Sequence, residues 1–272
     1  MKDLGEIRAA SHPPRKWIFK SLLVEGTVNI LYGPPDTGKS WFALRLIERW
    51  ITQEKFLWYG PSPTSGKKAI YYALEDDERQ FKEDRAAFLS YDLDGVLKIS
   101  HDLSLDSLAD VSGLKKAILD CNAGIVVVDN LLSVRIGNRE LNENRDMKLF
   151  MESLRRVAQE TGACIVVVHH TGKFSSRAMA SGIDESDADT TAPLGATALF
   201  ALAYTRIYLS TKSGSQMRVR IRGKGIPRHY DYAVFEDRDW RLSNKDPAKL
   251  DVNDIDSERG IGLQTWRGRP TP

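Results

Sequence analysis

The chain has 272 residues, of which 39 are basic and 37 acidic, so that its formal net charge is +2. This length allows one large domain or two small ones, and the balanced charge excludes a polycation that coats nucleic acid over its whole surface. The sequence holds no apolar run near the roughly 18 residues that cross a bilayer and no apolar signal-peptide core at its start, so we expect a cytoplasmic protein without membrane contact.

Short apolar runs alternate with helix-patterned segments through the first three quarters of the chain. Two of the runs, IVVVD and CIVVVHH, are β-branched tracts typical of central strands that are covered on both faces. Between them, Met147, Phe150 and Leu154 recur at helical spacing. This order predicts an α/β fold, with a mostly parallel sheet flanked by helices. The five runs lie at 28–32, 69–74, 96–99, 124–129 and 163–169.

The pattern changes after Thr205, where RIYLST, MRVRIRG and YDYAVFED follow one another without room for helices. Such a succession predicts antiparallel strands that complete the sheet. We therefore expect an N-terminal arm at 1–15, one domain at 16–243 and an acidic, flexible tail at 244–272. The two cysteines, Cys121 and Cys164, are expected to be buried reduced thiols, with a metal site or a disulfide as the alternative.

The segment GPPDTGKS lies between the first apolar run and a helical segment, as a phosphate-binding loop requires. Main-chain N–H groups of such a loop bind anionic oxygens. Lys39 would neutralise the β and γ phosphates, and the hydroxyl of Ser40 would bind Mg²⁺. Asp36 is unusual for this loop, because it brings a negative charge near the phosphates. The predicted nucleotide-binding residues are Gly33, Pro34, Pro35, Asp36, Thr37, Gly38, Lys39, Ser40 and Trp41.

Two carboxylates are expected at the carboxyl edge of the sheet, beside this loop. Asp129 ends the tract IVVVD, where it would be the second protein anchor of Mg²⁺; a solvated aspartate at a strand end is the alternative. Glu75 leaves the preceding strand first and is the predicted general base for hydrolysis. The alternative is that Glu75, Asp76 and Asp77 only provide an acidic start for the next helix.

A pair of histidines ends the tract CIVVVHH at the same edge. Adjacent side chains on a strand alternate in direction, so only one of them is expected to face the nucleotide. We assign His170 as the sensor of the γ-phosphate, with His169 or a packing role as the alternatives. No third ligand at suitable spacing supports a metal site made by the pair.

Several segments together resemble a known family, the RecA-like P-loop ATPases related to the plasmid helicase RepA and to DnaB-type replicative helicases. The similarity runs from about Trp17 to Leu242. It implies ATP and Mg²⁺ as cofactors, and the same roles for Lys39, Ser40, Glu75, Asp129 and His170. The segments are W-x-x-x-x-L at 17–22, GPPDTGKS at 33–40, YYALEDD at 71–77, IVVVDN at 125–130, ELNEN at 140–144, TGACIVVVHHTGK at 161–173, RIRGKGIP at 220–227 and YAVFEDRDWRL at 232–242.

The resemblance also implies a homo-oligomeric ring, a hexamer, with nucleotide at the subunit interfaces. A late strand of related ring helicases carries two basic residues that reach the ATP of the neighbouring subunit, and the matching pair here is Arg222 and Lys224, with Arg220 in reserve. The alternative is an exposed strand whose basic residues point to solvent. This chain departs from its relatives in reading PLGAT at 193–197, where they often have Arg-Gly-Ser, and in the order of the late basic pair.

Two polar loops, at 133–145 and 174–192, would face the channel of such a ring. Their cations could follow the phosphates of single-stranded DNA without reading its sequence, although solvated loops without a DNA role are the alternative. The leading hypothesis is a DNA-dependent ATPase that acts as a replicative helicase motor. The alternatives are an ATP-gated filament protein of recombination or annealing, and a small-molecule phosphotransferase. The basic side chains in question are Arg135, Arg139, Arg145, Lys173 and Arg177, which precede an acidic stretch at 184–189.

Overall fold

The computed structural model describes residues 3–9, 14–136, 144–170, 196–213, 216–224, 226–236 and 239–242. Within these residues, nine strands form one sheet in the order β11-β10-β9-β8-β3-β7-β6-β4-β5. The strands are β3 (Val28–Gly33), β4 (Lys68–Ala73), β5 (Leu97–Ser100), β6 (Ala123–Asp129), β7 (Cys164–His170), β8 (Thr205–Ser213), β9 (Gln216–Gly223), β10 (Ile226–Glu236) and β11 (Asp239–Leu242).

The strands from β8 to β5 run parallel, and β9, β10 and β11 continue the sheet in antiparallel pairs. The two β-branched tracts lie side by side, with Val127 of β6 opposite Val166 of β7. Both strands are buried through most of their length because helices cover each face of the sheet. The predicted α/β architecture, with its antiparallel C-terminal extension, is confirmed.

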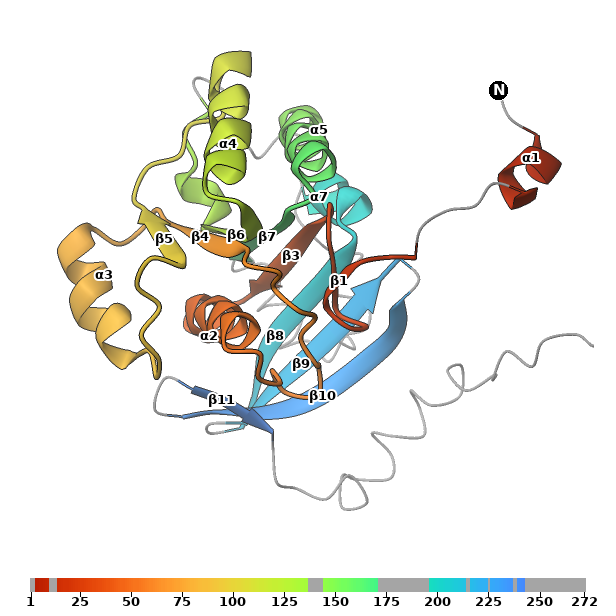
Figure 1. Ribbon diagram of the computed structural model, residues 1–272. Coiled ribbons are helices and arrows are strands. Elements are labelled where there is room, and N and C mark those ends of the chain that lie inside the picture. Colours follow the sequence, from red (N-terminus) through yellow and green to blue (C-terminus); the bar gives the residue numbers. More distant parts are fainter. Residues whose placement is uncertain are drawn as a thin grey trace, which may run out of the picture.

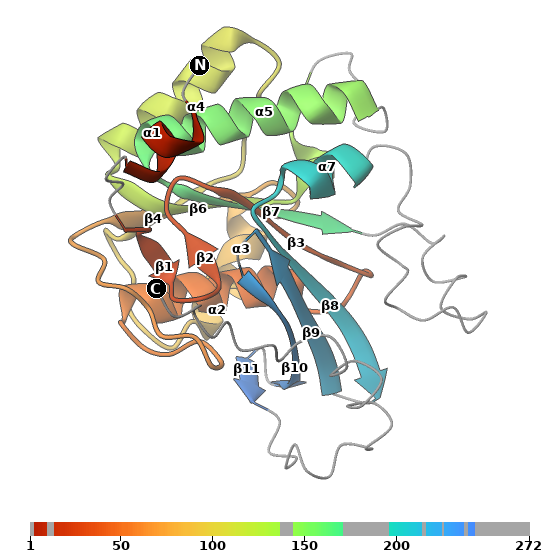
Figure 2. The ribbon, with the colours of Figure 1, turned by 90° about the vertical axis from the view of Figure 1, so that its right-hand side faces the viewer.

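Two layers enclose the sheet (Figures 1 and 2). One face packs against α2 (Lys39–Ile51) and the hairpin of β1 (Trp17–Phe19) and β2 (Leu23–Val24). The other face packs against α4 (Leu108–Asp120), α5 (Asn144–Thr161) and α7 (Ala196–Leu202). The remaining short elements are α1 (Leu4–Ala9), α3 (Glu78–Asp84), η1 (Ala86–Phe88) and η2 (Leu131–Ser133).

Some local features differ from the expectation. The helical pattern after Glu75 divides at Arg85 into α3 and η1. The weakly amphipathic α4 was not predicted, although its N-terminus carries a capping box in which Ser107 and Asp110 exchange hydrogen bonds. Cys164 is buried as expected, whereas Cys121 is only partly buried, and both are free thiols. Among the helices that the structure describes, none is long and apolar enough to cross a membrane.

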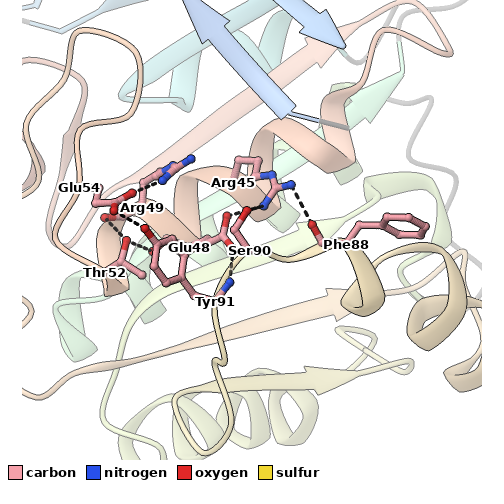
Figure 3. A network of polar contacts seen from close by, with 8 residues as sticks. All are labelled: Arg45, Glu48, Arg49, Thr52, Glu54, Phe88, Ser90 and Tyr91. Carbon is pink, nitrogen blue, oxygen red and sulfur yellow. Dashed lines mark hydrogen bonds and ion pairs between the residues drawn. The ribbon is translucent and has the colours of Figure 1, made fainter. Parts of the chain in front are cut away.

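A buried polar network joins the middle of α2 to the segment that follows η1 (Figure 3). Arg45 and Glu48 form an ion pair of 2.6 Å, and their side chains are 4% and 0% exposed. Arg45 also donates to the carbonyl of Phe88 at 2.8 Å, and Glu48 accepts from the main-chain N–H groups of Ser90 and Tyr91. These hydrogen bonds compensate the cost of burying two charges. The network therefore anchors this segment on the helix that begins at the phosphate loop.

Candidate nucleotide-binding site

The segment from Gly33 to Ser40 forms a tight loop between β3 and α2. Asp36 and Gly38 both adopt left-handed backbone conformations, with φ of 60° and 71°. A Cβ on Gly38 would lie 2.8 Å from the ring of Phe235, and the indole Nε1 of Trp240 donates to the Gly38 carbonyl at 3.3 Å. Strands β10 and β11 thus pack against the loop, which explains why this position requires glycine.

Lys39 lies inside this loop, with 3% of its surface exposed. Its Nζ donates a hydrogen bond to the carbonyl of Pro34. Burial lowers the pKa of Lys39 to about 8, and the nearby carboxylates of Asp129, Asp36 and Glu75 oppose this shift. The ammonium group of Lys39 is thus close enough to these three carboxylates for their charges to raise its pKa.

The indole of Trp41 belongs to the packing of α2 and not to the loop's inner surface. It is 7% exposed, and it lies beneath the guanidinium groups of Arg45 and Arg85, at 5.8 Å and 5.6 Å from its ring. The sequence predicts Trp41 as a nucleotide-binding residue. Its buried ring limits that role to the main chain at the start of the helix.

Asp129 ends β6 beside the loop and is 7% exposed. Its Oδ2 accepts a hydrogen bond from the hydroxyl of Tyr71, on the neighbouring strand β4. Burial raises the pKa of Asp129, and the hydroxyl groups of Tyr71 and Ser40 oppose this shift. Its Oδ1 is buried and has no hydrogen-bond partner in the part of the chain that the structure describes. A carboxylate oxygen left in this state beside Ser40 fits a Mg²⁺ ligand set of oxygen donors.

Removing the Tyr71 hydroxyl tests, without an activity assay, whether this group stabilises the Asp129 carboxylate. Tyr71→Phe should lower the free energy of unfolding by about 2 kcal/mol, because a charged acceptor loses its buried donor. Tyr72→Phe is the matched control on the same strand, and it should change stability by less than about 0.5 kcal/mol. Denaturant unfolding at neutral pH measures both. Equal effects of the two substitutions would show that the Tyr71 hydroxyl does not stabilise Asp129.

Glu75 lies two residues beyond the end of β4, and its side chain is 53% exposed. The Nδ2 of Asn130 donates to its Oε1, and Nε2 of His170 lies 3.8 Å from its Oε2. Asn130 itself is fully buried, and its Oδ1 accepts from the main-chain N–H of Ser133 at 3.2 Å. The amide of Asn130 is therefore fixed in orientation, and it holds the Glu75 carboxylate beside β6 and β7.

The two acidic residues after Glu75 have other partners. Asp76 accepts from Nε of Arg85 at 3.1 Å, and Asp77 is the N-cap of α3, where it accepts from the N–H of Gln80 at 2.7 Å. The alternative role of this stretch, an acidic start for the next helix, is thus provided by Asp77. Among the three carboxylates, Glu75 is the one placed next to His170.

His169 and His170 lie on the same edge but beside different groups. Burial lowers the pKa of His169 to about 4, with further contributions from His170 and Lys39. His169 is therefore neutral at physiological pH. The Nδ1 atoms of both rings are buried without a hydrogen-bond partner among the described residues. Nε2 of His170 lies beside Glu75, whereas the charge of Lys39 contributes to the lowered pKa of His169.

The late basic pair lies away from the loop of its own chain. Tyr32 pairs with Tyr208, so the loop begins near the level of Leu209. Arg222 pairs with Arg206, which precedes Leu209 by three residues on β8. This places Arg222 about 10 Å further toward the amino-terminal end of the parallel strands. The register thus separates Arg222 from the nucleotide loop within one chain.

The alternative of a solvent-exposed basic strand is wrong for Arg220, which is 3% exposed and whose guanidinium lies over the ring of Tyr208. Lys224 is exposed at the end of β9. Partial burial, together with the charges of Arg155 and Arg206, lowers the pKa of Lys224. The end of β9 therefore carries a local concentration of positive charge.

Much of the two predicted channel loops lies outside the described residues, as do Arg139, Lys173, Arg177, the acidic stretch at 184–189, positions 193–195 and the tail. Of the loop cations that are described, Arg135 is exposed and forms an ion pair with Asp102, and Arg145 lies exposed in the first turn of α5.

Several residues of this site were not identified from the sequence. Tyr71 and Asn130 contact the two predicted catalytic carboxylates, and Phe235 and Trp240 pack on the phosphate loop from distant strands. The position of Asn130, directly after Asp129, was a local signal. The contacts of the other three residues depend on strand pairing and could not be read locally.

Comparisons with known proteins agree with this geometry. The AAA domain family matches residues 2–176. The KaiC-like protein PH0186 of the hyperthermophilic archaeon Pyrococcus horikoshii OT3 superposes with a TM-score of 0.57 at 16% identity, covering 83% of this chain and 93% of that one. A second solved structure, that of an ATPase domain, superposes with a TM-score of 0.58 at 14% identity, covering 80% of this chain and 86% of that one. No curated protein sequence matches the chain.

The two structural similarities concern the fold, and the family match covers more than half of the 272 residues. The glycine-containing loop, the buried lysine and the carboxylate at the end of β6 are the features that a P-loop ATPase needs for its nucleotide. The chain therefore belongs to the AAA domain family, and its fold is that of a RecA-like P-loop ATPase.

Proposed function

We propose that this protein is an oligomeric, DNA-dependent ATPase that works as a helicase-like motor on single-stranded DNA. The observation that carries the ATPase part is the convergence of Lys39, Asp129 and Glu75 at one edge of the sheet, next to the loop. The similarity to RepA and DnaB-type enzymes supports the motor part.

Each residue has a defined role in hydrolysis under this proposal. Lys39 and the loop N–H groups would bind the phosphates, and Ser40 and Asp129 would hold Mg²⁺. An ion held there would supply positive charge that offsets the negative charge of the phosphates. Glu75, oriented by Asn130, accepts a proton from the attacking water. Nε2 of His170 lies 3.8 Å from Oε2 of Glu75. In this proposal His170 is the sensor of the γ-phosphate.

The late basic pair suggests how hydrolysis could depend on assembly. Arg222 lies on the edge of the sheet opposite the loop, so it would need a second subunit to reach a nucleotide. A cation supplied by a neighbour stabilises the charge of the transition state only in the oligomer. Head-to-tail contacts of this kind generate closed rings or helical filaments. We infer a ring, a hexamer, with nucleotide between subunits.

Two measurements on the same preparation test this function. The first is steady-state ATP turnover with and without single-stranded DNA, with Lys39→Ala as the control for contaminating ATPases. The second is particle mass in the presence of a non-hydrolysable ATP analogue. Stimulation by DNA together with a closed oligomer supports the motor. Long polymers on DNA would instead favour the filament protein, and DNA-independent turnover by a monomer would contradict both.

A further inference from the structure

His101 follows β5 and reaches the turn that carries Glu75. Its Nδ1 lies 3.1 Å from the carbonyl oxygen of Ala73 and 2.7 Å from that of Asp76. Both partners are hydrogen-bond acceptors, so Nδ1 must carry the hydrogen. The two carbonyls flank Leu74 and Glu75. One imidazole N–H therefore bridges the start and the end of the turn between β4 and α3.

The direction of the His101 ring is fixed by packing. Its ring lies edge-on to the ring of Phe81, with centroids 6.1 Å apart and an interplanar angle of 70°. Phe81 is 5% exposed and also contacts the ring of Tyr71, at a centroid distance of 5.8 Å. The imidazole thus rests on the same aromatic group that supports the tyrosine bound to Asp129.

The main chain of the turn has few regular hydrogen bonds of its own. The strand β4 ends at Ala73 and α3 begins at Glu78, so Asp76 belongs to neither element. The N–H of Leu74 donates to the carbonyl of Asp129 at 2.7 Å, which ties one side of the turn to β6. His101 ties the other side to the end of β5. The backbone that carries Glu75 is thereby held between two strands.

We propose that His101 is a positioning residue, which holds the turn at 73–76 so that Glu75 stays beside Asn130 and Asp129. The inference rests on the proposed function, in which Glu75 is the general base, and it adds a residue that acts through the main chain of this turn. A misplacement of about 1 Å at a catalytic group can reduce turnover by about 100-fold, so loss of the bridging N–H has a kinetic effect through Glu75.

Three substitutions separate the N–H donor from the ring. His101→Phe keeps the aromatic contact with Phe81 and removes the donor. His101→Asn places an amide nitrogen where Nδ1 was, whereas His101→Gln carries the same amide one bond further out. We expect kcat to fall by about 10- to 100-fold in His101→Phe and His101→Gln. His101→Asn should retain kcat to within about threefold of the wild type.

The affinity for a fluorescent ATP analogue provides the second readout. Glu75 is not needed for nucleotide binding, so all three variants should bind the analogue within about twofold of the wild type. Equal losses of kcat in His101→Asn and His101→Gln would overturn the donor role. Wild-type kcat in His101→Phe would overturn the inference as a whole.

A double-mutant cycle separates this inference from the proposed function. If His101 acts through Glu75, adding His101→Phe to Glu75→Gln should cost no further turnover, measured under single-turnover conditions. An additive loss would show that His101 acts elsewhere, and would overturn the inference. If Glu75→Gln alone retains full turnover, the proposed role of Glu75 fails, and the inference fails with it for that separate reason.

Discussion

Replacing Glu75 with glutamine is expected to reduce ATP turnover by about 100- to 10,000-fold while the protein still binds nucleotide. Glutamine has the same shape and can still accept the hydrogen bond from Asn130, so the local structure should persist. Its amide cannot accept the proton of the attacking water. The substitution therefore removes the proposed chemistry without removing the phosphate loop or Asp129.

The measurement compares single-turnover hydrolysis with the affinity for a fluorescent ATP analogue. Glu83→Gln is the matched control, because Glu83 is an exposed carboxylate on α3 whose ion pair is with Arg79. This control should retain wild-type turnover. Retained turnover in Glu75→Gln would move the general base to Asp76 or Asp77, and the ion pair of Asp76 with Arg85 would then have to open during catalysis.

The order and direction of the strands could be predicted because the signals are local. β-branched tracts such as those of β6 and β7 are typical of strands covered on both faces. The length of sequence between two such tracts is enough for the helix that connects parallel strands. The antiparallel extension followed from segments too short to contain helices. The weak amphipathic pattern of α4, with two fully buried residues, gave a much smaller signal.

The candidate site could be predicted to the extent that its residues end strands or lie in the phosphate loop. Lys39, Asp129 and Glu75 meet because the carboxyl ends of parallel strands share one edge of the sheet. The supporting contacts depend on which strands are neighbours, and this is not encoded locally. Tyr71 reaches Asp129 because β4 lies next to β6, and His101 reaches the Glu75 turn because β5 lies next to β4.

Mixing two inactive variants should restore activity if the site is shared between subunits. Lys39→Ala removes the phosphate-binding lysine, and Arg222→Ala removes the cation proposed to act on the neighbour's nucleotide, so each variant alone should have little turnover. In a mixed ring, an interface with an intact Lys39 on one side and an intact Arg222 on the other is complete. Random assembly of equal amounts makes about one quarter of interfaces complete, from one half multiplied by one half.

The expected result is thus about a quarter of wild-type turnover per interface in the equal mixture, far above the mean of the two variants alone. The matched control mixes Lys39→Ala with Glu75→Gln. Each nucleotide site takes both Lys39 and Glu75 from the same chain, so no site in the mixed oligomer has both residues intact, and the mixture should remain inactive. Rescue in both mixtures would indicate that neighbouring subunits contribute residues other than Arg222 to each other's sites. Mass measurement must first confirm oligomers of mixed composition. Absence of rescue in the first mixture would then contradict a role of Arg222 at the neighbour's nucleotide. The positive charge at the end of β9 would in that case bind a different anion.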